Sequence, residues 1–305
     1  MLWFIVRRLL ELIPTLLLIL IGSFALMRFA PGSPFDTERE IPPEVRAELN
    51  AKYGFDKPWP VQFATYLGNL MHFDFGLSTK YPQRTVTEII WAGFPVTLAL
   101  AGVAITWSLA LGISAGVIGA IRQNTVWDYA AMSLAMIGIS IPSFVLGPLL
   151  ALVFALKLHW LPAAGWGTIW HVILPGITLG TIYAAYIARL TRSGMLEVSR
   201  MDFIRTARAK GLRERLIVWR HMLKGGLLPV VSFLGPAIAN MLVGSLVVER
   251  IFNTPGIGPY FVDAALNRDY FLVMGVVVIY AVFLLLMNLV VDIAYAFLDP
   301  RIRYE

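Results

Sequence analysis

Cysteine is absent from the 305 residues, and histidine occurs only four times. Without cysteine the chain can form no disulfide, use no catalytic thiolate and build no cysteine metal site. The histidines lie far apart in the sequence, and none belongs to a paired ligand motif such as His-Glu-x-x-His. They are His72, His159, His171 and His221. No bound metal or cofactor is therefore expected.

Charge is also scarce, because only 14% of the residues are charged while 58% are hydrophobic. Soluble domains carry about 25% charged residues. The charges cluster and leave long uncharged runs, as a bilayer core requires because it solvates neither ions nor unpaired backbone groups. The formal net charge of +6 does not indicate nucleic acid, because basic residues beside a membrane are explained by the positive-inside rule.

Nucleotide and ion-coupling motifs are missing as well. A phosphate-binding loop ends in Gly-Lys-Ser or Gly-Lys-Thr, yet none of the six lysines is followed by Ser or Thr. ATP chemistry must then be absent or supplied by another chain. Neither a nucleophile elbow nor a pair of carboxylates at helical spacing occurs within an apolar run, which disfavours an intramembrane hydrolase or an ion-coupled carrier. These self-sufficient classes remain the rival interpretation.

Six uncharged runs have about the 20-residue length that spans a bilayer, which predicts an all-α polytopic membrane protein with six transmembrane helices. The runs are 9–28, 94–119, 130–156, 173–190, 226–248 and 271–293. Pro14 is expected in the first turn of its helix, and Pro142 and Pro148 predict a break in the third span. The apolar run after Arg7 and Arg8 is interpreted as an uncleaved anchor.

The runs divide the chain into an N-terminal region with the first span, an extracytoplasmic insert, a five-helix core and a tail. Their ranges are 1–29, 30–93, 94–298 and 299–305. Within the insert, Pro42-Pro43-Glu44 predicts a helix start and Gly54 its end. A second helix would place Phe63, Tyr66, Leu67 and Leu70 on one face, for packing against the bundle or for docking an external partner.

Basic residues set the predicted orientation. Ten Lys and Arg lie between Arg189 and Lys224, whereas the short loops on the other side hold only Lys157, Arg250 and Arg268. Positively charged loops stay in the cytoplasm. Both termini and the loop 191–224 are therefore placed in the cytoplasm.

The basic loop reads as two short helices. Met201, Ile204 and Ala207 share a face of the first, Lys210 suits its C-terminus, and Gly211 ends it. The second would carry three apolar side chains on one side, with arginines around them. These are Leu212, Leu216 and Trp219. Such a helix either lies on anionic lipid or inserts into a groove of a soluble partner.

Several motifs of the chain resemble those of one known family. The segment Arg205-Thr-Ala-Arg-Ala-Lys-Gly211, followed by His221 and Leu228-Pro229, resembles the cytoplasmic coupling loop in membrane subunits of ABC importers of the peptide and nickel branch. Family loops generally read Glu-Ala-Ala-x-x-x-Gly, and Arg205 and Thr206 replace the first two residues here, as in the peptide branch.

The resemblance extends along the whole chain. Similar segments are Arg28-Phe-Ala-Pro-Gly-Ser-Pro34, Tyr53-Gly-Phe-Asp-Lys-Pro58, Asp74-Phe-Gly-Leu-Ser78, Val248-Glu-Arg-Ile-Phe-Asn-Thr-Pro-Gly-Ile-Gly258 and Ala264-Ala-Leu-Asn-Arg-Asp-Tyr270. Chain length and the tail most resemble the first membrane subunit of oligopeptide permeases. Dipeptide, nickel, glutathione and opine import remain open within the branch.

The resemblance implies the type I ABC importer transmembrane fold in a bacterial cytoplasmic membrane. It implies a complex with a second homologous membrane subunit, two cytoplasmic ATPases that use ATP and Mg²⁺, and an extracytoplasmic peptide-binding protein. Coupling to the ATPases is then expected at Arg205, Thr206, Ala207, Lys210, Gly211 and His221. Candidate residues of the substrate path are Asn240, Ser245 and Glu249.

Overall fold

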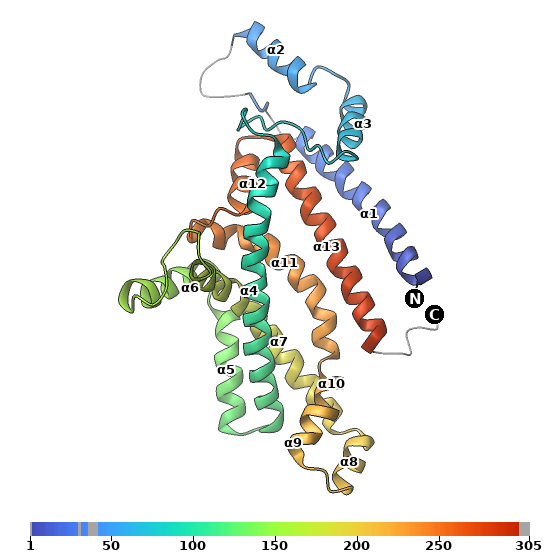
Figure 1. Ribbon diagram of the computed structural model, residues 1–305, viewed down its shortest axis with the longest axis vertical. Coiled ribbons are helices and arrows are strands. Elements are labelled where there is room, and N and C mark those ends of the chain that lie inside the picture. Colours follow the sequence, from blue (N-terminus) through green and yellow to red (C-terminus); the bar gives the residue numbers. More distant parts are fainter. Residues whose placement is uncertain (1, 30–31, 36–41, 299–305) are drawn as a thin grey trace. The chain divides into compact units, whose positions relative to one another are not determined.

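The computed structural model describes residues 2–29, 32–35 and 42–298, and these ranges fold as helices joined by loops (Figure 1). The predicted tail 299–305 lies outside the described residues. The helices are α1 Leu2–Phe29, α2 Pro43–Tyr53, α3 Trp59–Leu70, α4 Val86–Ile121, α5 Val126–Ser140, α6 Ser143–Leu150, α7 Trp170–Ser199, α8 Asp202–Ala209, α9 Glu214–Leu216, α10 Leu223–Gly226, α11 Leu228–Ile251, α12 Ile257–Leu266 and α13 Tyr270–Leu298. Two π-helical stretches, η1 Ala151–Lys157 and η2 Ile217–Met222, continue α6 and α9.

Within the described ranges, five helices are long and apolar enough to cross a membrane, and a bent pair forms a sixth candidate span. The five spans are Arg7–Phe29, Val86–Ile121, Trp170–Ser199, Leu228–Ile251 and Tyr270–Ile293. The bent pair joins α5 to α6 and η1 at an angle of 109°. Ile141, which precedes Pro142, is extended with φ −107° and ψ 117°, because a proline disfavours the helical conformation of the residue before it. The predicted break is confirmed at Pro142, whereas Pro148 lies inside α6.

The position expected for Pro14 is wrong. Helix α1 begins at Leu2, so Pro14 lies in its interior rather than in its first turn. The proline has no N–H to donate to the carbonyl one turn earlier. Apolar residues upstream of Arg7 extend the helix beyond the run from which the span was predicted.

One compact unit contains Leu98–Thr254, with α7 at its centre. Helix α7 approaches α4 closely at four glycines. Added β-carbons at Gly112 and Gly116 would lie 2.7 and 2.6 Å from carbonyl oxygens of α7, and those at Gly176 and Gly180 would meet Val103 and Ala104 of α4. The Ser108 hydroxyl donates a hydrogen bond to the Gly180 carbonyl at 2.8 Å. The missing side chains of these glycines therefore permit the close contact between α4 and α7.

The second compact unit contains Val6–Thr97 and Pro255–Phe283. Helix α2 begins after Pro42 and ends at Gly54, whose φ of 70° is left-handed, as predicted. Tyr66 of α3 is buried, and Phe63, Leu67 and Leu70 pack with it in a core that includes residues of α1, α4, α12 and α13. The predicted apolar face of α3 thus packs inside this unit. The insert 30–93 shares its core with the neighbouring spans.

Candidate functional site

The basic loop after α7 folds into two short helical stretches, as the sequence predicts. Helix α8 follows the extended residue Met201, and the Thr206 hydroxyl donates to the Asp202 carbonyl at 3.0 Å within it. Lys210 caps its C-terminus, and Gly211 turns the chain with a φ of 74°. Glycine is favoured there because left-handed backbone strains residues that carry a β-carbon.

Ala207 lies in the loop's own core and not on its exposed face. Ala207 is 6% exposed and Ile204 is fully buried. Their cluster also contains residues of η2 and of the adjoining ends of α4 and α7. These are Ile217, Val218, Met222, Ala120, Met195 and Val198. The small side chain of Ala207 therefore lets α8 pack against its own chain.

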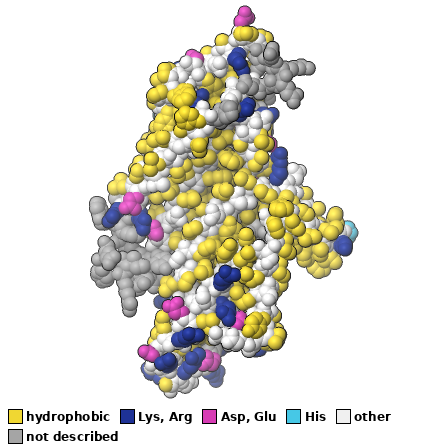
Figure 2. Space-filling model, turned by 180° about the vertical axis from the view of Figure 1, so that it is seen from behind, with side chains coloured by type: hydrophobic (Ala, Val, Ile, Leu, Met, Phe, Trp, Pro, Cys, Tyr) yellow, Lys and Arg dark blue, Asp and Glu magenta, His cyan; other side chains and the backbone are white. Residues whose placement is uncertain are grey.

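A different set of apolar side chains remains exposed on the loop. Phe203, Leu216 and Trp219 are 49%, 42% and 61% exposed. Met201 and Leu212 are exposed as well. Lys and Arg side chains gather around this end of the unit (Figure 2). The loop therefore presents exposed apolar side chains with basic residues around them.

The remaining predicted coupling residues lie at the surface of the loop. Arg205 is exposed and pairs within α8 with Asp202, at 3.4 Å. Lys210 is exposed and His221 is half-buried. An ion pair between Arg208 and Glu214, at 2.7 Å, links α8 to α9. Both its side chains are well exposed, so the pair contributes little to stability and serves mainly to orient the turn.

An ion pair between α5 and α7 was missed by the sequence analysis. Arg192 donates two hydrogen bonds to the Asp128 carboxylate, at 2.8 and 2.7 Å, and the Asn124 backbone N–H donates a third at 2.9 Å. The Asp128 side chain is 3% exposed. This bidentate ion pair holds α7 against the start of α5. Helix α7 leads directly into the basic loop. The one sequence feature that points to this ion pair is that Asp128 is the single carboxylate between residues 121 and 130.

The three candidate path residues lie in different environments on α11. Asn240 is exposed, whereas Ser245 and Glu249 are fully buried. The Ser245 hydroxyl donates to the Leu242 carbonyl of its own helix at 2.6 Å. The Glu249 side chain has no exposed surface, although the residue lies near the end of a candidate span. Asn240 alone of the three faces outward from the chain.

Two of the quoted motifs meet in a hydrogen-bond network within the second compact unit. The Ser78 hydroxyl donates to the buried Asp269 carboxylate, which also accepts the Lys80 and Leu272 backbone N–H groups at 3.1 and 3.2 Å. Lys80 donates to Asn267 at 3.0 Å. Burial, and then the Asp269 charge, raise the pKa of the nearby Tyr53. The network joins segments 191 residues apart, which local pattern reading cannot detect.

Among the residues that the structure describes, no group of three or more His, Asp or Glu side chains is placed to hold a metal ion. The arrangement consists of apolar spans, a loop with an exposed apolar face, and an insert packed on span ends. These features provide surfaces for helix packing and for contact with other molecules.

The model of the family described as "Binding-protein-dependent transport system inner membrane component" matches residues 108–304, and the model of its N-terminal region matches 1–101. The chain belongs to this family. As a family member it is a multi-pass permease of the inner membrane. The resemblance seen in the coupling-loop and outer-loop motifs is thereby confirmed.

Relatives match over the full length of this permease. It is 51% identical to the oligopeptide transport system permease protein OppB of Escherichia coli K12, with 100% of both chains covered. It is 45% identical to the dipeptide transport system permease protein DppB of Bacillus subtilis, over 98% of this chain and 97% of the relative. A glutathione transport system permease, GsiC of Pectobacterium atrosepticum, is 40% identical, with both chains fully covered.

Solved structures share the fold. The inward-facing MetNI methionine ABC transporter matches with a TM-score of 0.55 at 18% identity, over 69% of this chain and 96% of that chain. An amino acid ABC transporter matches with a TM-score of 0.51 at 18% identity, over 68% and 94%. The predicted type I ABC importer transmembrane fold is confirmed.

Proposed function

We propose that this permease lines, together with a second homologous subunit, the pore of an ATP-driven importer of peptides. Oligopeptides are the favoured substrates, because the oligopeptide permease is 51% identical over its full length, compared with 45% for the dipeptide permease. Two cytoplasmic ATPases supply the ATP and Mg²⁺ chemistry, and an extracytoplasmic peptide-binding protein delivers the substrate. The chain itself binds no cofactor and catalyses no reaction.

The geometry of the loop α8 to η2 carries this proposal. A chain that lacks a phosphate-binding loop must receive the energy of ATP through contact with another protein. The loop has its own buried core, which includes side chains at the ends of α4 and α7, so force applied to its surface reaches those two spans directly. Its exposed aromatic residues, Phe203 and Trp219, are of the kind that carry binding energy at protein interfaces.

The basic charge of the loop supports a cytoplasmic location for the loop and for both chain termini. ATP-driven closure of the ATPases would move α8 and Gly211, and the spans would exchange an inward-facing for an outward-facing packing. Asn240, exposed on α11, is the best candidate for contact with a passing peptide.

The exposed aromatic residues Phe203 and Trp219 form the proposed docking face, which can be tested by introducing a charge there. Trp219→Glu should abolish co-purification of the two ATPases, because a carboxylate would be buried without a partner in place of an aromatic side chain. Loss of a buried aromatic contact costs about 2 kcal/mol or more at an interface. Phe203→Glu should behave alike.

The matched control is Trp166→Glu, which makes the same change at a 41% exposed tryptophan of the loop before α7. It should leave ATPase association unchanged, and all three variants should reach the membrane in wild-type amounts. Retention of the ATPases by both loop variants would mean that the loop lies on lipid instead, and the proposed coupling would be wrong.

A further inference from the structure

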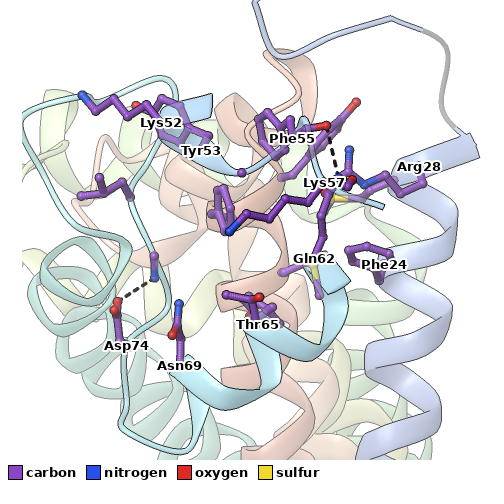
Figure 3. Close-up of a pocket in the computed structure, with 18 of the residues that line it drawn as sticks. Phe24, Arg28, Lys52, Tyr53, Phe55, Lys57, Gln62, Thr65, Asn69 and Asp74 are labelled. Carbon is purple, nitrogen blue, oxygen red and sulfur yellow. Dashed lines mark hydrogen bonds between the residues drawn. The ribbon is translucent and has the colours of Figure 1, made fainter. Parts of the chain in front are cut away.

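A cavity of about 310 Å³ lies between α1, the insert and the start of α13, entirely within the second compact unit. Figure 3 shows Phe24 and Arg28 reaching into it from α1, with Gln62, Thr65 and Asn69 along α3. Lys52 and Lys57 also line the cavity. The one carboxylate in the lining, Asp74, already accepts the Gly76 backbone N–H at 2.9 Å. The lining therefore carries a net positive charge.

Among the described residues, Arg28 has aromatic neighbours but no acidic partner. Its guanidinium lies 5.3, 5.0 and 5.3 Å from the ring centres of Phe24, Phe55 and Tyr270. No ion pair or hydrogen bond of its side chain occurs among the described residues. Aromatic faces attract a cation, but they leave the five N–H donors of the guanidinium available. The planar donor set of arginine matches a phosphate or carboxylate.

An apolar groove of about 260 Å³ adjoins this cavity and shares Phe24 and Arg28 with it. Apart from Arg28, its lining is apolar and comes from α1 and the start of α3. The other lining residues are Ile21, Phe24, Ala25, Phe29, Trp59, Pro60 and Phe63. Arg28 thus separates a polar, positively charged space from an apolar one that follows the end of a membrane span.

We propose that the two spaces together bind one anionic phospholipid. Its phosphate contacts Arg28 in the cavity, and an acyl chain follows the apolar groove. Arg28 is the penultimate residue of the candidate span Arg7–Phe29, which places its guanidinium at the depth of lipid headgroups. Trp59, 50% exposed and in edge contact with Phe29, is an aromatic side chain typical of that interface. A free phosphate or a peptide carboxylate would leave the groove unused.

The test measures lipid binding to the delipidated full chain in neutral detergent, by native mass spectrometry and by the lipid-dependent rise in Tm. The probes are phosphatidylglycerol, phosphatidylcholine and glycerol 1-phosphate, which has the phosphate without acyl chains. Phosphatidylglycerol should bind at least about tenfold more tightly than either other probe, since charge-assisted hydrogen bonds and buried methylenes both contribute. Equal binding of phosphatidylcholine would overturn the anion site, and equal binding of glycerol 1-phosphate would overturn the acyl-chain groove.

Variants locate the site. Arg28→Gln should weaken phosphatidylglycerol binding about tenfold or more, as expected for a lost charged hydrogen bond. Arg84→Gln removes the same charge from an exposed position of the insert outside both spaces, and should leave binding unchanged. If both variants bind alike, the lipid is held by general surface charge and the proposed site is wrong.

The groove has its own variant. Ala25→Trp fills the groove and should weaken phosphatidylglycerol while sparing glycerol 1-phosphate. Leu26→Trp, at a 74% exposed position next to it, is the control. Unchanged lipid binding in Ala25→Trp would overturn the assigned pose.

Discussion

At the scale of single residues, the absence of side-chain atoms decides how closely the spans approach one another. A β-carbon at Gly180 of α7 would collide with the Ala104 carbonyl oxygen of α4. One at Gly102, also in α4, would meet nothing within 4 Å. Gly102 is exposed. Small residues act in this way between membrane helices because van der Waals contact is the main attraction there.

We expect Gly180→Ala to destabilise the permease by about 1–3 kcal/mol, the usual cost of overpacking. Gly102→Ala makes the same chemical change in open space and should be neutral within about 1 kcal/mol. Thermal unfolding of the purified chain in detergent compares them. Equal Tm values for both variants would show that the contact between α4 and α7 is looser than described.

The Asp128 pair and Ala207 show where reading the sequence stops at this scale. Periodicity correctly placed Ile204 and Ala207 on one face, but it could not tell whether that face meets a partner or the chain's own η2. Asp128 and Arg192 are 64 residues apart, and only the packing of α5 on α7 brings them together. The burial of Glu249 is not visible in the sequence either, because segments distant along the chain produce it.

At the scale of elements, the apolar runs predicted the spans because the bilayer imposes a length that the sequence must meet. The break at Pro142 followed from the restriction that a proline places on the residue before it. The end of α8 at Gly211 followed from the ease with which glycine adopts a left-handed backbone. The π-helical stretches η1 and η2 have no such local signal. Each continues a preceding α-helix, α6 or α9, and contributes buried side chains to a core cluster.

The side of the membrane on which each element lies can be tested with single cysteines, since the native chain has none. Arg84→Cys in the insert and Arg215→Cys in the loop are both at exposed positions. An impermeant thiol reagent added to spheroplasts should label position 84, and position 215 should react only after the membrane is opened. Labelling of position 215 from outside would reverse the proposed orientation.

At the scale of the whole molecule, the predicted insert 30–93 is part of a larger unit. Its core is built with α1, α12 and the start of α13, so a division by hydropathy alone separates segments that fold together. The aromatic contacts of Phe55 with Tyr270 and Phe271 illustrate this, since they join residues more than 200 positions apart. Family motifs mark both segments but do not indicate that they touch.

The central claim is that this permease imports peptides only as part of an ATP-driven complex. The most direct measurement is uptake of a labelled oligopeptide into proteoliposomes that contain the permease, its homologous partner, two ATPases and the binding protein, with glutathione and Ni²⁺ as competing substrates. We predict that uptake requires ATP, Mg²⁺ and every subunit, and that unlabelled peptides compete with the labelled one. The permease alone should hydrolyse no ATP. Peptide uptake by the permease alone under an ion gradient, without ATP, would contradict the account.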